Sequence, residues 1–325
     1  MLTQQLLHLK WQEQVTSLRV EMCSMIKSKM TLLPLPLKSL CCLSRMSSRA
    51  AEGSKIHAGK VAVMTASTKG IGFAVARRLA QQGAHVVLSS RKQENVNAAI
   101  EQLAAENLPV SGTVCDAEKT EDRKNLVQLA LDKYGGIDYL FSSAATEAVS
   151  KDILETTKED WDENLNLNLM AMFFLVQEVF PHMQKRGGGS IVLNSSVLGF
   201  AGIPTVGPYS VSKTAVNGLI KVLAPALAPM NIRVNGLAPG LIRTDYSTRS
   251  LIDAGERMKT VSGRQGDFQE LDQEAFLGYL QTIFGFSRLG EPEECAGIVS
   301  FLLSSDASYI TGEIIVVGGG YRSRI

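Results

Sequence analysis

The chain has 325 residues, 45% of them hydrophobic and 20% charged, and its formal net charge at pH 7 is +1. This length accommodates one large α/β domain or two smaller ones, and the composition is that of an ordinary globular protein. The near-neutral charge indicates no nucleic-acid partner, no run of eighteen apolar residues predicts a membrane span, and the five cysteines have no metal-ligand spacing with the four histidines. We therefore predict free thiols and no metal site.

Residues 1–59 differ in composition from the rest of the chain. They are poor in acidic residues, with only Glu13, Glu21 and Glu52, and their apolar stretch TLLPLPLKSLCCL is interrupted by two prolines and a lysine. Such a basic segment is typical either of an organelle-targeting presequence or of a disordered extension. We therefore assign the folded domain to residues 60–325.

Strands and helices alternate through this domain. Short apolar runs bounded by turn residues predict strands, and longer runs with helical periodicity predict helices. Regular interleaving implies right-handed crossovers and a parallel sheet covered on both faces. The predicted fold class is α/β, a single Rossmann-type doubly wound parallel sheet of about seven strands, with its ligand at the carboxyl ends of the strands. The predicted strands span 60–66, 84–90, 109–116, 137–145, 189–196, 232–239 and 312–319, and the helices 72–83, 95–107, 122–135, 160–187 and 209–229.

The turn after the first predicted strand is rich in glycine and reads TASTKGIGFAVA, residues 65–76. Gly70 and Gly72 stand where the strand passes into a helix, so backbone N–H groups and the helix dipole can meet a pyrophosphate. A bare G-x-G is equally compatible with a tight turn that only packs the helix on the strand. The position of this turn in the first βαβ unit favours a nucleotide.

Four further residues stand at related spacings. Tyr209 lies four positions before Lys213 in YSVSKT, a pair that a chain of this length carries by chance about half the time. Ser196 lies thirteen residues before Tyr209, at the end of a predicted strand, and Asn168 lies on the preceding long helix. With the glycine turn, these residues resemble the short-chain dehydrogenase/reductase family, whose T-G-x-x-x-G-x-G fingerprint appears here with Ala66 at its first glycine.

The resemblance implies that Asn168, Ser196, Tyr209 and Lys213 are catalytic. A free tyrosine titrates near ~10, and the Lys213 ammonium together with a positive nicotinamide ring is expected to lower the pKa of Tyr209. Tyr209 would then exchange a proton with a carbonyl oxygen that Ser196 hydrogen-bonds. In the family the lysine also holds the nicotinamide ribose, and the asparagine anchors a water that supplies protons to the lysine.

The cofactor is expected to be NADP(H). The second strand ends in Ser90, Arg91 and Lys92 without the carboxylate that usually binds the ribose of NAD, so Arg91 and Lys69 can bind a 2′-phosphate. The alternative is that both are solvated surface cations. The cofactor-binding residues that the resemblance implies are Thr65, Ser67, Lys69, Gly70, Ile71, Gly72, Ser90, Arg91, Asp116, Ala144, Tyr209, Lys213, Pro239, Gly240, Ile242 and Thr244.

The sequence departs from the family pattern at three places. Ala66 carries a methyl group where the family has glycine, so the turn is expected to keep φ negative there. The family's N-N-A-G reads SSAA at residues 142–145, and because serine replaces only some hydrogen bonds of asparagine we expect lower stability. Residues 245–287, the expected substrate lid, look about ten residues longer than is usual, which weakens substrate assignment.

Within the family, the chain is similar to the NADP-dependent retinol dehydrogenase/carbonyl reductase subgroup. That similarity implies NADPH-dependent reduction of retinal, aromatic ketones and α-dicarbonyls, and a homotetramer that binds a small apolar substrate. Two alternatives stay open: a non-catalytic NADPH-binding or oligomerisation module, and a β-ketoacyl reductase. The last residues, Ser323, Arg324 and Ile325, resemble the peroxisomal S-K-L signal, while the basic amino terminus fits a mitochondrion and the cytoplasm is a third option.

Overall fold

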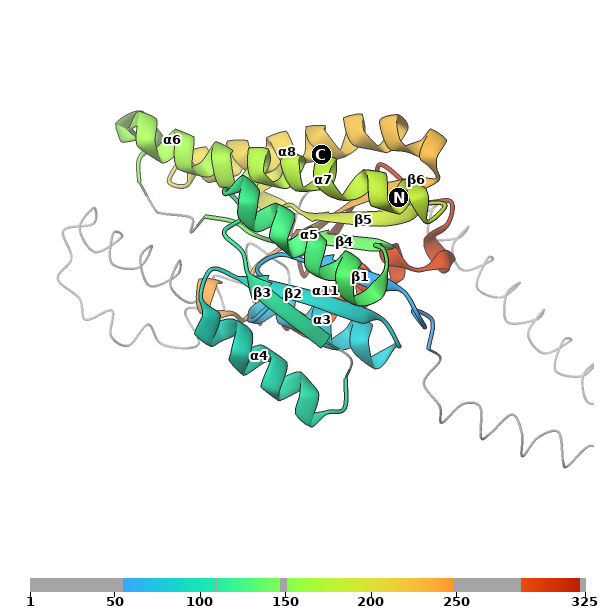
Figure 1. Ribbon diagram of the computed structural model, residues 1–325. Helices are drawn as coiled ribbons and strands as arrows, with labels where there is room; N and C mark the ends of the chain where they lie inside the picture. Colours follow the sequence, from blue (N-terminus) through green and yellow to red (C-terminus); the bar gives the residue numbers. More distant parts are fainter. Residues whose placement is uncertain (1–54, 109, 147–150, 248–287, 322–325) are drawn as a thin grey trace, which may run out of the picture. The chain divides into compact units, whose positions relative to one another are not determined.

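Seven parallel strands form one sheet in the order β3-β2-β1-β4-β5-β6-β7 (Figure 1). The chain first builds outward from β1 to β3, then returns to the centre and builds the other half from β4 to β7. The predicted doubly wound α/β fold is therefore confirmed, with its topological switch between β1 and β4. The strands are β1 Val61–Met64, β2 His85–Ser90, β3 Val110–Val114, β4 Tyr139–Ser142, β5 Gly189–Asn194, β6 Ile232–Pro239 and β7 Ile314–Val317.

The computed structural model describes residues 55–108, 110–146, 151–247 and 288–321. The described residues belong to one compact unit that begins at Lys55. Most of the predicted extension, most of the predicted lid and the tail at 323–325 lie outside the described residues. Within them, no helix is long and apolar enough to cross a membrane, and no group of three histidine, cysteine or acidic side chains is arranged to hold a metal ion.

Helices cover both faces of the sheet and enclose two cores (Figure 1). One face packs against α3 Gly70–Gln81, α4 Gln93–Ala105 and α11 Pro292–Leu303, around buried residues such as Leu79 and Leu103. The other packs against α5 Thr120–Tyr134, α7 Ala171–Lys185 and α8 Gly207–Leu227. The element α11 is absent from the sequence prediction. Short 3₁₀ segments η2 Ile153–Glu155, η4 Val197–Gly199, η5 Ala228–Met230 and η7 Ser305–Ala307 complete the described elements.

The predicted long helix 160–187 is divided by a π-helical segment. Helix α6 Lys158–Leu165 passes into the π segment η3 Asn166–Met170, which passes into α7. The Ala171 N–H donates to the Asn166 carbonyl, five residues back. Such segments interrupt the regular α-helix and are frequent at functional sites. This one contains Asn168, one of the four predicted catalytic residues.

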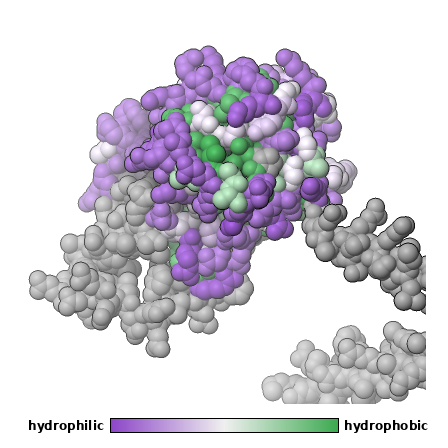
Figure 2. All heavy atoms as spheres, turned by 60° about the horizontal axis from the view of Figure 1, so that its bottom comes forward, coloured by the Kyte–Doolittle hydropathy of each residue, from purple (hydrophilic) through white to green (hydrophobic). Residues whose placement is uncertain are grey.

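Apolar side chains reach the surface on several helices. Met170 and Phe174 near the start of α7, Val222 on α8 and Phe301 on α11 are among the exposed large apolar residues. Figure 2, in which the bottom of Figure 1 is turned forward, shows apolar residues gathered within a mostly hydrophilic surface.

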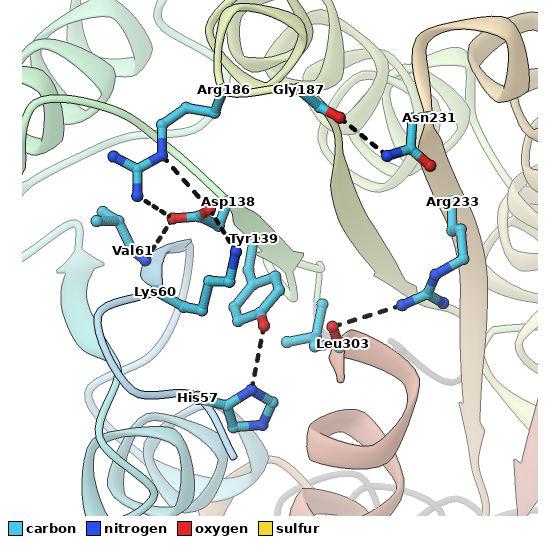
Figure 3. Close-up of polar contacts among 10 residues, drawn as sticks. All are labelled: His57, Lys60, Val61, Asp138, Tyr139, Arg186, Gly187, Asn231, Arg233 and Leu303. Atoms are coloured by element: carbon cyan, nitrogen blue, oxygen red, sulfur yellow. Dashed lines mark hydrogen bonds and ion pairs between the residues drawn. The ribbon is translucent and has the colours of Figure 1, made fainter. Parts of the chain in front are cut away.

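The amino ends of the central strands are held by a buried polar network (Figure 3). Asp138, just before β4, accepts hydrogen bonds from the Val61 N–H at 2.9 Å, Lys60 Nζ at 3.1 Å and Arg186 Nη2 at 2.8 Å. The carboxylate is buried and therefore needs these partners. The network joins the starts of β1 and β4 to the connection that leads into β5.

A second buried cluster lies beside it. His57 is fully buried, with Nδ1 3.2 Å from the Tyr139 hydroxyl and Nε2 3.1 Å from the Ser300 hydroxyl. Burial lowers the pKa of His57 to about 4 and raises the pKa of Tyr139 to about 12, so both side chains are neutral at pH 7. The ring thereby fastens the segment before β1 to β4 and α11.

Candidate active site

The predicted functional residues follow the carboxyl ends of strands on both sides of the topological switch. The glycine turn follows β1, Ser90 ends β2, and Asp116 follows β3. Ala144 follows β4, Ser196 follows β5 and Pro239 ends β6. Because the strands are parallel, these segments share one edge of the sheet, as expected for a ligand site of this fold.

Close contacts explain the glycines of the turn after β1. A Cβ atom on Gly72 would lie only 2.2 Å from the Ala66 carbonyl oxygen. Gly70 has φ +52°, and a Cβ there would lie 3.0 Å from Thr244 Cγ2, so the turn also meets the segment after β6. Bare backbone at the start of α3 fits the pyrophosphate of a nicotinamide dinucleotide.

The conformation of Ala66 differs from the prediction. Its φ is +48°, so the expectation of a negative φ was wrong. The alanine adopts the left-handed conformation that the family's glycine adopts freely, because the Ala66 carbonyl must pass close over Gly72. The shape of the turn is thus preserved at the cost of local backbone strain.

Two residues of the turn support its shape through buried contacts. The Ser67 hydroxyl donates to the Met64 carbonyl at 3.2 Å and accepts from the Ser89 N–H at 3.0 Å. Ile71 packs against the core formed with α3. The hydroxyl proton of Ser67 is thus used within the protein, and its backbone N–H also donates to the Ser89 carbonyl at 3.0 Å.

The SSAA stretch after β4 is bonded to both neighbouring strands. Thr65 Oγ1 lies 3.4 Å from Ser142 Oγ and accepts from the N–H groups of Ser143 and Ala144 at 3.1 and 3.4 Å. The Asn194 side-chain amide on β5 donates to Ser143 Oγ at 3.1 Å. Asn194 and Thr65 thus supply hydrogen bonds at the place where the motif has lost its asparagines. Lower stability stays a prediction.

The predicted cofactor cations are exposed. Lys69 stands at the N-cap position of α3, and its ammonium lies 3.7 Å from the Asp245 carboxylate, with both side chains more than half exposed. Arg91 follows the last residue of β2 and is exposed. Beyond β3, the carboxylate of Asp116 accepts from the Glu118 N–H at 3.3 Å. These positions leave the two cations accessible to an anionic ligand.

The segment after β6 closes over the glycine turn. A Cβ on Gly240 would lie 2.8 Å from the Gly318 Cα, which explains the glycine that follows Pro239. Ile242 is buried in the core, so its side chain is not accessible to solvent or to a ligand. Thr244 lies beside Gly70, and its hydroxyl accepts from a backbone N–H three residues on, capping a helical turn.

Three of the four predicted catalytic residues lie together. Ser196 is near enough to the Tyr209 hydroxyl to lower its pKa, and Lys213 Nζ lies 5.5 Å from the centre of the Tyr209 ring. Ser195, which precedes Ser196, instead directs its hydroxyl to the Lys213 carbonyl and to Asn217 on α8. The structure therefore places Ser196, the serine preferred from spacing, against the tyrosine.

Burial dominates the titration of this pair. It lowers the pKa of Lys213 to about 7, and the ammonium donates to the Asn194 carbonyl at 2.9 Å. Burial also raises the pKa of Tyr209, although the nearby Tyr246 and Ser196 side chains lower it. In the protein alone the pKa of Tyr209 is therefore raised and not lowered as expected, because desolvation of the phenolate outweighs these neighbouring groups.

Asn168 reaches the site through Ser212. Its side-chain oxygen accepts from the Thr146 N–H at 2.8 Å, and its amide donates to Ser212 Oγ at 2.9 Å. Ser212 Oγ in turn donates to the Tyr209 carbonyl at 2.7 Å. Asn168 therefore ties the loop after β4 to the first turns of α8. Its part in a proton relay stays a prediction.

Two contacts at the site were not predicted from the sequence. The Asn194 carbonyl, which holds Lys213, is a backbone group and gives no sequence signal. Tyr246, which lies near enough to Tyr209 to lower the pKa of its hydroxyl, stands only two residues after Thr244 in LIRTDYS, and this second tyrosine beside the predicted motif was the only signal in the sequence.

Family models and similar proteins match most of this chain. The family described as short chain dehydrogenase matches residues 60–254, and one described as enoyl-(acyl carrier protein) reductase matches residues 268–322. Dehydrogenase/reductase SDR family member 4 of Homo sapiens is 51% identical over 82% of this chain and 89% of the relative. The protein of the same name from Sus scrofa is 49% identical over 86% of this chain and 94% of the relative.

Solved structures give the same answer. A 7α-hydroxysteroid dehydrogenase with NADH and 7-oxo glycochenodeoxycholic acid is 28% identical, with a TM-score of 0.72 over 82% of this chain and 96% of that one. A variant of actinorhodin polyketide ketoreductase with NADPH is also 28% identical, with a TM-score of 0.72 over 82% and 98%. The relatives match the subgroup predicted from the sequence. This chain belongs to the short-chain dehydrogenase/reductase family, whose members are oxidoreductases that bind a nicotinamide dinucleotide.

Proposed function

We propose that this oxidoreductase reduces apolar and aromatic carbonyl compounds, including retinal and α-dicarbonyls, with NADPH. The observation that carries the proposal is the meeting of Ser196, Tyr209 and Lys213 beside a glycine turn at one edge of the sheet. A binding module has no use for a buried phenol next to a buried amine. The relatives of about 50% identity support the same activity class.

The protein's part in the reaction is proton transfer and charge stabilisation. The reduced nicotinamide supplies a hydride when bound. The Ser196 hydroxyl donates to the carbonyl oxygen, and Tyr209, kept protonated by its buried position, gives that oxygen its proton. Lys213 has a pKa of about 7, so it can return a proton toward Tyr209 near neutral pH.

The substrate class is tested by NADPH absorbance with a panel of four carbonyls. The panel holds all-trans-retinal, an aryl methyl ketone, an α-diketone and an acetoacetyl thioester. We expect turnover of the first three, and a fall of about 10³-fold in Tyr209→Phe because the proton donor is lost. Tight NADPH binding without turnover on any carbonyl would instead favour the binding module, and turnover of the thioester alone a β-ketoacyl reductase.

Preference for NADPH rests on Arg91 and Lys69. Both are exposed cations at the edge where the adenosine half of a dinucleotide binds this fold, and β2 ends in a serine rather than a carboxylate. A guanidinium binds a 2′-phosphate in two parallel hydrogen bonds. Arg91 is therefore proposed as the main determinant of the choice between NADPH and NADH.

This determinant is tested by Arg91→Glu. The variant should lose at least about tenfold in kcat/KM with NADPH and retain its rate with NADH, because the carboxylate repels a 2′-phosphate and accepts from ribose hydroxyls. Lys133→Glu on α5, also exposed, is the control with the same change of charge. Equal losses with both cofactors in Arg91→Glu would contradict the assignment.

We also propose a homotetramer in a peroxisome or a mitochondrion. The exposed apolar residues on α7, α8 and α11 provide surfaces that association can cover. The compartment rests on the terminal Ser-Arg-Ile and on the basic first 59 residues. Light scattering tests the assembly. Imaging of chains that lack either the amino-terminal segment or the carboxyl-terminal tripeptide tests the compartment.

A further inference from the structure

A buried chain of hydrogen bonds leads to the first turns of the catalytic helix. Four polar side chains from four separate segments form it, and each is more than nine-tenths buried: Thr146 after β4, Asn164 on α6, Asn168 in η3 and Ser212 on α8. Polar groups buried this deeply are stable only when their donors and acceptors are paired. The side-chain oxygen and nitrogen atoms of all four are paired with one another or with backbone groups.

In one branch of this chain, a backbone carbonyl fixes the direction of every hydrogen bond. Asn164 Nδ2 donates to the Asp160 carbonyl at 2.8 Å, and Asn164 Oδ1 is therefore free to accept. The Thr146 hydroxyl donates to that oxygen at 2.8 Å, so its own oxygen accepts from Asn168 Nδ2 at 3.1 Å. The Thr146 N–H also donates to Asn168 Oδ1 at 2.8 Å. Thr146 thus binds both ends of the Asn168 amide.

The second branch reaches the backbone of the proposed proton donor. The Asn168 amide donates to Ser212 Oγ at 2.9 Å, so the hydroxyl proton of Ser212 is directed to the Tyr209 carbonyl, 2.7 Å away. Tyr209 is the third residue of α8. One amide thereby joins the loop after β4, which carries the predicted cofactor residue Ala144, to the turn of α8 that carries the phenol.

The hydroxyl of Thr146 keeps this amide in its orientation. Asn168 Nδ2 has two protons, and one enters each branch. Without the hydroxyl, Asn164 Oδ1 would lose its donor, and it lies 3.4 Å from the same nitrogen. An unpaired buried oxygen is costly, so the amide should turn toward Asn164 and away from Ser212. The link to α8 would then weaken although the surrounding apolar packing is kept.

We propose that Thr146 is a positioning residue whose hydroxyl orients the Asn168 amide and thereby sets the position of Tyr209 relative to the bound cofactor. The inference rests on the proposed function, because its consequence is a change in the reduction step. A displaced phenol is poorly aligned with the substrate oxygen when hydride arrives, so kcat falls. The affinity for NADPH depends mainly on the glycine turn and the exposed cations, so it should be kept.

The first test compares Thr146→Val with Thr146→Ser. Valine resembles threonine in shape and keeps the backbone N–H but has no hydroxyl, whereas serine keeps the hydroxyl. In Thr146→Val we expect kcat for the preferred carbonyl to fall about tenfold, with KM for NADPH within about twofold of wild type. Thr146→Ser should restore most of kcat, which a role in packing alone would not explain. Enzyme is counted by its stoichiometric binding of NADPH, so that only folded protein is compared.

Thr113→Val, on the edge strand β3, is the matched control for this substitution. Its hydroxyl contacts only the next carbonyl along the chain, that of Val114, at 3.4 Å, and we expect its kcat to equal that of wild type. An unchanged kcat in Thr146→Val, or equal losses in the valine and serine variants, would overturn the proposal.

A second readout needs no turnover. Thr146→Val, Ser212→Ala and the double variant are unfolded in urea. Because both hydroxyls bind the same Asn168 amide, the double variant should lose less unfolding free energy than the two single variants lose together. Additive losses would contradict the proposal, since the two branches would then be independent. A loss that is less than additive in an enzyme that reduces no carbonyl would uphold the link while the proposed function fails.

Discussion

The two ends of the sheet are built on opposite principles. At the amino end, Asp138 is bonded to two cations and a backbone N–H, and His57 is buried as a neutral ring between two hydroxyls (Figure 3). At the carboxyl end, Ala66 has φ +48° and Lys213 is buried with a pKa of about 7. The amino end therefore stabilises the fold. The carboxyl end contains backbone strain and a desolvated lysine, which lower stability and which the proposed chemistry requires.

The largest effect that separates the two ends is expected for Lys213→Met. Activity should fall by about 10³-fold, because the amine beside Tyr209 is lost. At pH 7 the free energy of unfolding should rise by up to about 4 kcal/mol, since a lysine whose pKa is about 7 when folded and 10.5 when unfolded opposes folding.

The difference in unfolding free energy between Lys213→Met and wild type should depend on pH. Between pH 7 and 10.5 the unfolded chain holds a proton that folded Lys213 has released, so wild type gains stability as pH rises. The stability advantage of Lys213→Met should therefore shrink over this window in denaturant titrations. An advantage that is constant with pH would mean that Lys213 is charged in the folded protein.

The amino end should respond in the reverse manner. Asp138→Ala is expected to lower the free energy of unfolding by about 2–4 kcal/mol, because it leaves Lys60, Arg186 and the Val61 N–H without their buried acceptor. The kcat of the folded fraction should stay within twofold of wild type. Asp132→Ala, on the exposed surface of α5, is the matched control. A large loss of kcat in Asp138→Ala would contradict the division of stability and catalysis between the two ends of the sheet.

The smallest effect is expected for Ala66→Gly. Glycine adopts the positive φ without a Cβ penalty, but it also gains entropy in the unfolded chain. The balance should raise the free energy of unfolding by roughly 0.5–1 kcal/mol with unchanged activity. A decrease in stability would show that Ala66 is not strained.

Local patterns in the sequence were enough to predict the fold. Alternating apolar runs predicted all seven strands, and the spacing from Ser196 to Tyr209 selected from the Ser195–Ser196 pair the serine that lies near the phenol, whereas Ser195 directs its hydroxyl to α8. These features depend on periodicity and on distances along the chain. The contacts of Tyr246 depend instead on how the segment after β6 folds back.

The remaining differences come from tertiary forces. Ala66 takes a conformation that its side chain disfavours because the Gly72 contact fixes the turn. The pKa of Tyr209 follows burial, which sequence spacing does not measure. Asp138 precedes a strand like many aspartates, and only the arrival of Lys60 and Arg186 from elsewhere in the chain makes it the centre of a network.

The π segment at Asn166–Met170 sets the phase between two helices. One residue in an α-helix corresponds to a rotation of about 100°, so the wider turn changes the phase between α6, whose buried residue is Asn164, and α7, whose buried face is apolar, while Asn168 faces the loop after β4. Loss of one residue here would restore an uninterrupted helix and leave its length almost unchanged. It would also turn Asn168 away from Thr146 and Ser212, so the chain could keep its fold and lose the alignment of its catalytic helix.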